Sequence, residues 1–177
     1  MVPEPLVTLV IEDSRWSEAT LAPLAENAAC ATLAYLGHAT PGYEIVLLAC
    51  DDARIATLNA DFRGKPQATN VLSWPEWDLA TEMDGGQPEP PPDANPDDPE
   101  ALGNIALAYE TCLREAIEQH KAFDAHLSHL VVHSVLHLLG YDHIRDKDAA
   151  LMEETERRIL AQLGVADPYE EAALGPE

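Results

Sequence analysis

The sequence predicts an α+β domain in which a small mixed sheet of about four strands packs with about five helices. Three observations favour this class. Four short runs of apolar and β-branched residues are typical of strands. Longer segments, in which apolar residues recur three and four positions apart, are typical of helices. The expected order is strand, helix, strand, helix, strand, strand, and then only helices. We expect residues 1–164 to form a single domain and residues 165–177 an acidic tail.

The first two strands are expected at residues 6–11 and residues 43–49. A helix is predicted between them, over roughly residues 20–36, because Gly37 is a typical helix stop. Pro23 would then fall in the first turn of this helix, where proline is tolerated. The face expected to enter the core carries Leu21, Leu24, Ala28 and Tyr35.

The second helix is expected to follow Asp51 or Asp52, since either side chain can accept hydrogen bonds from the first backbone amides of a helix. Its apolar stripe consists of Ile55, Leu58 and Phe62. A short strand is expected at residues 71–74, directly before Pro75. Proline cannot donate to a sheet ladder, so this strand is expected at a sheet edge.

Residues 76–100 are rich in proline, aspartate, glutamate and glycine. Such a composition buries little apolar surface, and we therefore expect a flexible acidic, proline-rich loop. The fourth strand is expected at residues 102–108, and a helix over about residues 111–120 follows it.

Two helices complete the predicted fold. The first is rich in histidine, and we expect Asp124 to cap its start and Gly140 to lie just past its end. The second is expected to start at Asp146 or Asp148 and to stop at Gly164.

Three histidines at the end of the histidine-rich helix have the spacing of a metal site. His133 and His137 are four residues apart and would lie on the same helical face. Gly140 permits a left-handed turn that could return His143 toward them. Three imidazoles with an open fourth position are the ligand set of a catalytic zinc site. The sequence therefore predicts a zincin-like metal helix that holds one Zn²⁺ per chain, although imidazoles also accept nickel or another divalent ion.

The same spacing occurs in metzincin proteases, H-E-x-x-H-x-x-G-x-x-H, but Ser134 stands at the glutamate position. That glutamate is the general base of the proteases, so a zincin-like metallopeptidase is the weaker alternative. His129 precedes His133 by four residues and is either a further ligand or a group that supports the site. Asp142 and Asp146 are candidates for orienting the metal-binding histidines.

The run H-S-V-L-H-L-L-G-Y-D-H at residues 133–143 resembles H-G-x-L-H-L-x-G-Y-D-H, the signature of the YbeY family of bacterial endoribonucleases and rRNA maturation factors. Residues 58–75 are similar to a second run of this family, which reads L-N-x-x-[FY]-R-x-x-x-x-x-T-N-V-L-S-F-P. Ser134 and Asn104 depart from the family pattern, which has glycine and aspartate there. The resemblance covers roughly residues 43–163 and implies the same α+β architecture.

This resemblance implies a metal-dependent, single-strand-specific endoribonuclease that acts in rRNA maturation, including 16S rRNA 3′-end processing, and in ribosome quality control. It implies that His133, His137 and His143 hold the catalytic metal and that Arg63 binds the scissile phosphate, which its planar guanidinium suits. Lys65 is a weaker candidate for the same role. Zinc lowers the pKa of bound water to about 7. The sequence leaves open the general base, and whether water or the RNA 2′-hydroxyl is the nucleophile.

Composition constrains the partners of the chain. Its formal net charge is −22 with only 10 lysines and arginines, which opposes strong binding to naked RNA. We therefore expect a metal or a partner protein to assist RNA binding, and the family resemblance implies that this partner is the small ribosomal subunit or one of its proteins. A third alternative is a non-enzymatic ribosome assembly factor with a structural zinc, in which His129 would fill the fourth ligand position.

The sequence also predicts a cytoplasmic location without a membrane partner. Cys30, Cys50 and Cys112 are widely separated and form no C-x-x-C pair, which is typical of a reducing compartment. No apolar run approaches the length that spans a membrane, and the N-terminal sequence lacks the features of a signal peptide.

Overall fold

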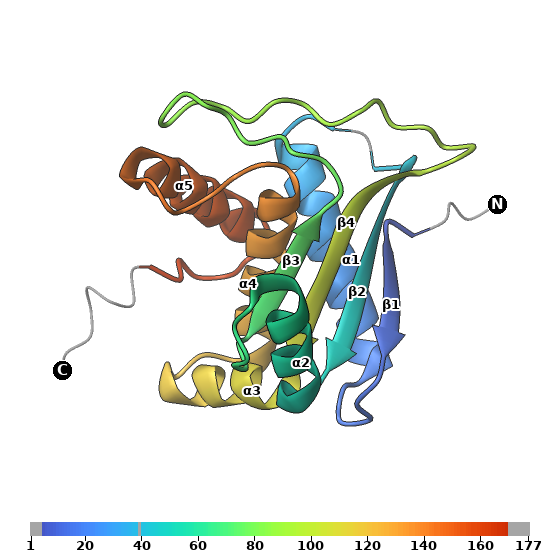
Figure 1. The fold of residues 1–177 in the computed structure, drawn as a ribbon, viewed down its shortest axis with the longest axis vertical. Helices are drawn as coiled ribbons and strands as arrows, with labels where there is room; N and C mark the ends of the chain where they lie inside the picture. The colour runs from blue at the N-terminus through green and yellow to red at the C-terminus, as the bar shows by residue number, and fades with distance from the viewer. Residues whose placement is uncertain (1–4, 39, 170–177) are drawn as a thin grey trace.

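The computed structural model describes residues 5–38 and 40–169 (Figure 1). These residues form β1 (Val7–Ile11), α1 (Glu18–Tyr35), β2 (Tyr43–Cys50), α2 (Asp52–Arg63), β3 (Val71–Pro75), β4 (Glu100–Ala108), α3 (Tyr109–Glu118), α4 (Phe123–Leu138) and α5 (Asp146–Gln162). Within the described residues the fold is therefore α+β with four strands and five helices, which confirms the predicted class. No helix in this part of the chain combines the length and the apolar character needed to cross a membrane.

The four strands form one mixed sheet in the order β1-β2-β4-β3. β1 and β4 both run parallel to β2, whereas β3 pairs with β4 in antiparallel orientation. β3 is thus an edge strand, as Pro75 at its end predicted, because the missing amide hydrogen of proline is harmless at an edge.

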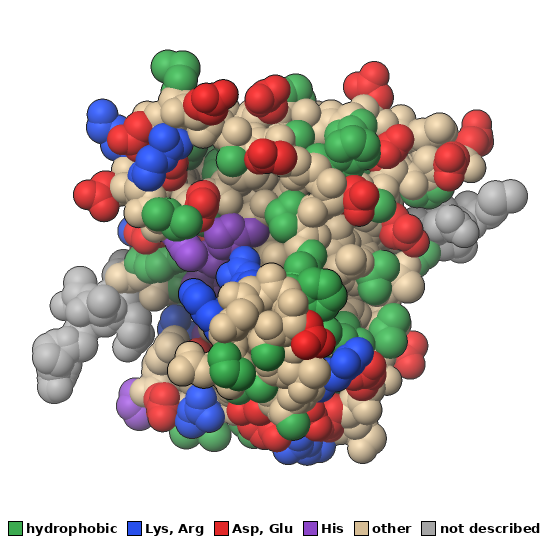
Figure 2. All heavy atoms as spheres, viewed as in Figure 1, with side chains coloured by type: hydrophobic (Ala, Val, Ile, Leu, Met, Phe, Trp, Pro, Cys, Tyr) green, Lys and Arg blue, Asp and Glu red, His purple; other side chains and the backbone are tan. Residues whose placement is uncertain are grey.

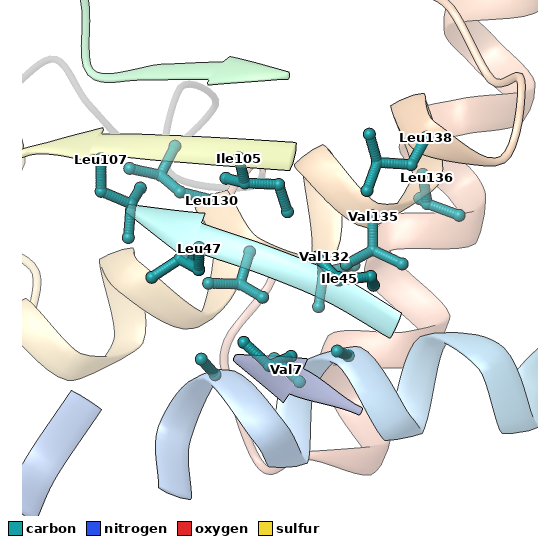
Figure 3. Packing of buried hydrophobic residues seen from close by; sticks show 14 of the residues in the cluster. Val7, Ile45, Leu47, Ile105, Leu107, Leu130, Val132, Val135, Leu136 and Leu138 are labelled. Atoms are coloured by element: carbon teal, nitrogen blue, oxygen red, sulfur yellow. The ribbon is translucent and has the colours of Figure 1, made fainter. Parts of the chain in front are cut away.

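Helices cover both faces of this sheet. α1 and α4 pack on one face, where Ile105 and Leu107 of β4 join the main core together with apolar side chains of β2 (Figures 1 and 3). α2 packs on the other face, where Ala106 and Ala108 of β4 meet Ile55. Side chains alternate between the faces because successive residues of a strand point in opposite directions. The main core therefore holds α4 firmly along its length.

Three expected details of the first two helices are wrong. α1 begins at Glu18 because the side chain of Ser17 accepts a hydrogen bond from the amide of Thr20, so Pro23 lies inside the helix and not in its first turn. Tyr35 is 37% exposed and stays out of the core. Phe62 is likewise 65% exposed, and its ring packs edge-on against Trp74 at a centroid distance of 5.7 Å.

The start of α4 also differs from expectation, whereas the ends of α5 lie where they were predicted. Ala122 precedes the first residue of α4, and no side chain caps this end. Asp124 lies in the first turn instead, where its charge still favours the positive end of the helix dipole. α5 begins at Asp146, as predicted, and Gly164 follows its end with a left-handed φ of 77°.

The acidic, proline-rich segment contains neither helix nor strand between residues 76 and 99. It is nevertheless attached to the folded body. The side chain of Leu79 is buried, the hydroxyl of Tyr43 donates to the carbonyl of Pro92 at 2.6 Å, and the guanidinium of Arg145 donates to two carbonyls of the segment. The described part of the expected tail, residues 165–169, folds back onto α5, and residues 170–177 lie outside the described residues.

Candidate metal centre

A cleft of about 890 Å³ opens between β3, the turn after α2, the first residues after β3 and the end of α4. Its lining includes His133, His137 and His143 as well as Arg63 and Lys65. Figure 2 shows histidine side chains gathered in a hollow of the surface, next to lysine and arginine side chains. All of the site residues implied by the family resemblance therefore line one cleft.

The three histidines of the predicted motif converge. His133 and His137 lie one turn apart on α4, with their ring centroids 4.6 Å apart. The ring of His143 is 5.3 Å from that of His133 and 5.0 Å from that of His137. Each residue offers one ring nitrogen to a group in which all such atoms lie within 4.8 Å of one another. This group is suited to hold a metal ion.

Gly140 makes this convergence possible in two ways. Its φ of 101° lies in a region that other residues rarely adopt, and it turns the chain back after α4. A Cβ atom at this position would also lie 2.7 Å from the backbone carbonyl of Leu79. The turn thus needs a residue without a side chain, and the buried Leu79 of the acidic segment packs directly against it.

Hydrogen bonds determine which tautomer each of the two helical imidazoles adopts when it is neutral. Nδ1 of His137 lies 3.0 Å from the carbonyl oxygen of Tyr141, which can only accept, so Nδ1 carries the proton. Nδ1 of His133 lies 2.5 Å from Oε2 of Glu156 and donates to this carboxylate. In the neutral rings, both Nε2 atoms are then free of hydrogen, and they lie 3.1 Å apart.

When both rings are neutral, these two Nε2 atoms are acceptors and cannot hydrogen-bond to each other. Tetrahedral zinc with Zn–N bonds of ~2.0–2.1 Å would separate two ligand nitrogens by about 3.3 Å. The arrangement of His133 and His137 therefore fits a shared cation.

The charges around the site also favour a cation. Burial lowers the pKa of His137 to about 4, with further lowering by His133 and His143, so its ring is neutral near pH 7 and its lone pair is available. Burial alone would raise the pKa of Glu156, but hydrogen bonds from His129 and His133 outweigh it and hold this pKa at about 2. A negative charge thus stands behind His133.

Glu156 was missed by the sequence analysis, which expected Asp142 and Asp146 to orient the histidines. The carboxylate of Asp142 accepts the backbone amide of His143 at 2.7 Å, and Asp146 is exposed at the start of α5. Glu156 is fully buried on α5. A signal was present, because Glu156 follows the core residue Met152 by four positions, which places a carboxylate on the apolar face of the predicted helix.

His129 does not join the three converging histidines. Its Nε2 donates to Oε1 of Glu156 at 3.2 Å, and it therefore supports the carboxylate behind His133. Ser134 is fully buried and outside the cleft lining, so it does not take the place of the protease glutamate. Asn104 is exposed on β4 and is also outside the cleft lining. Neither departure from the family pattern alters the group of three histidines.

Arg63 and Lys65 come from the end of α2. Gly64 ends this helix in a left-handed conformation with a φ of 67°, and the side-chain amide of Asn59 donates to the carbonyl of Gln67 at 2.9 Å, which holds the turn. Both basic side chains are exposed, and in the described part of the chain neither forms an ion pair. Both can therefore bind an anion that enters the cleft.

Comparisons with known proteins show which family the chain belongs to. The family model described as Endoribonuclease YbeY matches residues 10–164. A protein named Endoribonuclease YbeY from Cereibacter sphaeroides is 58% identical over 166 residues, which cover 94% of this chain and 99% of the relative. Another of this name, from Ruegeria sp. (strain TM1040), is 54% identical over 164 residues, covering 93% and 96%.

A solved structure also shows a similar fold. The solution structure of a Thermotoga maritima protein matches with a TM-score of 0.53 and 18% identity, covering 97% of this chain and 99% of the other. At this identity the match concerns the fold alone.

Proposed function

The chain belongs to the YbeY family of endoribonucleases, and we propose that it cleaves single-stranded RNA with a metal ion held by His133, His137 and His143. One observation carries the proposal above all. The Nε2 atoms of His133 and His137, which are both acceptors in the neutral rings, face each other at 3.1 Å in a cleft that also contains two exposed basic side chains. Such a pair of acceptors favours a cation, and the basic residues favour a phosphate.

Zn²⁺ is the ion that this donor set fits best, with one ion per chain, although three imidazoles also accept nickel or another divalent ion. When bound, it would supply a Lewis acid for a phosphoryl oxygen and a bound water of lowered pKa. In the described residues no fourth side chain completes the group, so one ligand position would remain for water or substrate.

The chain's own residues would bind and orient the RNA. Arg63 would donate two hydrogen bonds to the non-bridging oxygens of the scissile phosphate and balance the charge that develops on them. Lys65 would bind the same or the adjacent phosphate. The indole of Trp77, which lines the cleft and is 40% exposed, offers a face on which an unpaired base could stack, and this supports a preference for single strands.

We further propose that rRNA is the natural substrate, and that the protein acts in 16S rRNA 3′-end maturation and in ribosome quality control. The net charge of −22 supports a partner that supplies RNA affinity, and we propose the small ribosomal subunit or one of its proteins. An rRNA substrate would place the protein in the cytoplasm.

The other functions that the sequence left open find less support. A metallopeptidase of the zincin type needs a carboxylate beside the first histidine, whereas Ser134 is buried there. A structural zinc needs a fourth protein ligand, whereas the expected one, His129, is not part of the group formed by His133, His137 and His143, and its Nε2 bonds to Glu156.

The test is cleavage of a fluorescent single-stranded RNA and of its duplex by purified protein. We expect wild type to cut the single strand, and His137→Ala and Arg63→Glu to be slower by roughly 100-fold or more. Arg114→Glu is the matched control, because Arg114 is an exposed arginine of α3 outside the cleft lining, and it should match wild type. Equal cleavage by all four proteins would indicate a contaminating nuclease and overturn the proposal.

A further inference from the structure

The carboxylate behind His133 has an unusually complete set of partners. Glu156 is fully buried, Oε2 accepts from Nδ1 of His133, and Oε1 accepts from Nε2 of His129. The hydroxyl of Tyr169 donates to the same Oε1. Three donors from two different parts of the chain therefore hold one carboxylate, which leaves it little freedom to rotate.

Tyr169 reaches Glu156 because the chain folds back after α5. The carboxylate of Asp167 accepts the amide of Tyr169 at 2.8 Å and pairs with the guanidinium of Arg157 at 3.1 Å. The same guanidinium lies 5.3 Å from the centre of the Tyr169 ring. The ring also meets His129 edge-on at a centroid distance of 5.6 Å. The position of the tyrosine is thus determined by contacts with both α4 and α5.

We propose that Glu156 and Tyr169 are positioning residues of the metal site, and that the segment after α5 contributes to this site. This inference rests on the proposed function. Glu156 keeps the proton of His133 on Nδ1 and fixes the plane of the ring, so that Nε2 points at the ion. Tyr169 fixes the plane of the carboxylate. The expected acidic tail therefore contributes a side chain that acts on a metal ligand through one intermediate group.

The geometry distinguishes this role from simple packing. His137 obtains the same orientation from a backbone carbonyl, that of Tyr141, which no side-chain substitution removes. His133 depends on a side chain from another helix, so its orientation is sensitive to substitution. Outer partners of this kind typically change metal affinity by 10–100-fold when they are removed.

The experiment is a titration of the metal-free full-length chain with Zn²⁺ in competition with a chromogenic chelator. We expect Glu156→Gln to bind Zn²⁺ about 10–100-fold more weakly than wild type, and Tyr169→Phe about tenfold more weakly. The controls are Glu118→Gln, which alters an exposed carboxylate of α3 outside the cleft lining, and Tyr43→Phe, which removes a hydroxyl bonded to the carbonyl of Pro92. Both controls should bind Zn²⁺ like wild type.

Thermal unfolding of the metal-free proteins separates metal affinity from folding. Tyr169→Phe should unfold within a few degrees of Tyr43→Phe, because each loses one hydroxyl hydrogen bond. Equal zinc affinity of Tyr169→Phe and wild type would overturn the role of the tyrosine while leaving the proposed function intact. Failure of wild type itself to bind Zn²⁺ would instead overturn the metal site and with it this inference.

Discussion

Two of the pairs of imidazole and carboxylate that α4 forms are both partly buried and look alike, but they differ in what they face. Near its start, His126 pairs with Glu115 of α3 at 2.9 Å, and near its end, His133 pairs with Glu156 of α5 at 2.5 Å. Glu115 also accepts the side-chain amide of Asn70 at 3.0 Å, so the first pair ties α3, α4 and the residue before β3 together.

The difference lies in the second nitrogen of each ring. Nδ1 of His126 is buried and has no hydrogen-bond partner among the described residues, whereas Nε2 of His133 faces a second imidazole in an open cleft. A histidine paired with a carboxylate is therefore a structural tie at one end of the helix and a candidate metal ligand at the other. The pairing alone does not indicate a functional site. What indicates it is the environment of the ring nitrogen that is not bonded to the carboxylate.

The largest expected contrast comes from replacing His133 and His126 by alanine, one at a time. His133→Ala should lose its zinc and slow RNA cleavage by roughly 10³-fold, because the charge stabilisation that the metal supplies is worth several kcal/mol. His126→Ala should keep one zinc per chain and lose about 1–3 kcal/mol of unfolding free energy, because Glu115 loses a buried partner. Elemental analysis and urea unfolding measure both effects. Zinc retained by His133→Ala, or lost by His126→Ala, would erase the distinction between the pairs.

The glycine after α4 offers a second contrast, with another glycine as its control. Gly140→Ala should lower the free energy of unfolding by about 2–5 kcal/mol and weaken zinc binding, since strain and contact with Leu79 would displace His143. Gly164→Ala has a similar left-handed φ but open space around it, and should cost only about 1 kcal/mol. Similar losses in the two variants would contradict the tight contact at Gly140.

Trp77 lines the same cleft as the three histidines, and we expect it to contribute to RNA binding. Trp77→Ala should weaken binding of single-stranded RNA by about 1–3 kcal/mol, which is the usual contribution of one base stacked on an aromatic ring. Trp77→Phe should recover most of this loss. Fluorescence anisotropy with a non-cleaved RNA measures the affinities, and an unchanged affinity of Trp77→Ala would exclude stacking at this position.

The smallest expected effect concerns the pair of His126 and Glu115, which lies outside the cleft lining. Glu115→Gln should lower the free energy of unfolding by about 1–2 kcal/mol, because a carboxylate that accepts from both His126 and Asn70 becomes a neutral amide. Its zinc affinity should equal that of wild type. A zinc titration beside the one for Glu156→Gln makes the comparison, and parallel losses in the two variants would show that both pairs serve the metal.

Local features of the sequence were enough to predict much of this site. The spacing of His133 and His137 follows from the helical repeat, and Gly140 indicated the turn that returns His143. Pro75 indicated an edge strand. Each of these predictions depends on residues within a few positions of one another, where backbone geometry leaves few alternatives.

The remaining features depend on contacts between distant segments. Leu79 packs against Gly140 because the acidic segment lies against the turn after α4, and Tyr169 reaches Glu156 because the chain folds back after α5. Composition indicated neither contact. The start of α1 was misplaced because Ser17 caps it earlier than the apolar pattern suggested. Glu156 was predictable in principle, since a carboxylate on an apolar helical face needs buried donors.

The most direct test of the central claim is anomalous diffraction at the zinc absorption edge from crystals of the zinc-loaded protein. We expect one peak per chain at ~2.0–2.1 Å from Nε2 of His133, from Nε2 of His137 and from a ring nitrogen of His143, with a ligand position open to the cleft. A zinc ion elsewhere, or one whose fourth position is filled by His129, would contradict a catalytic metal centre at the end of α4.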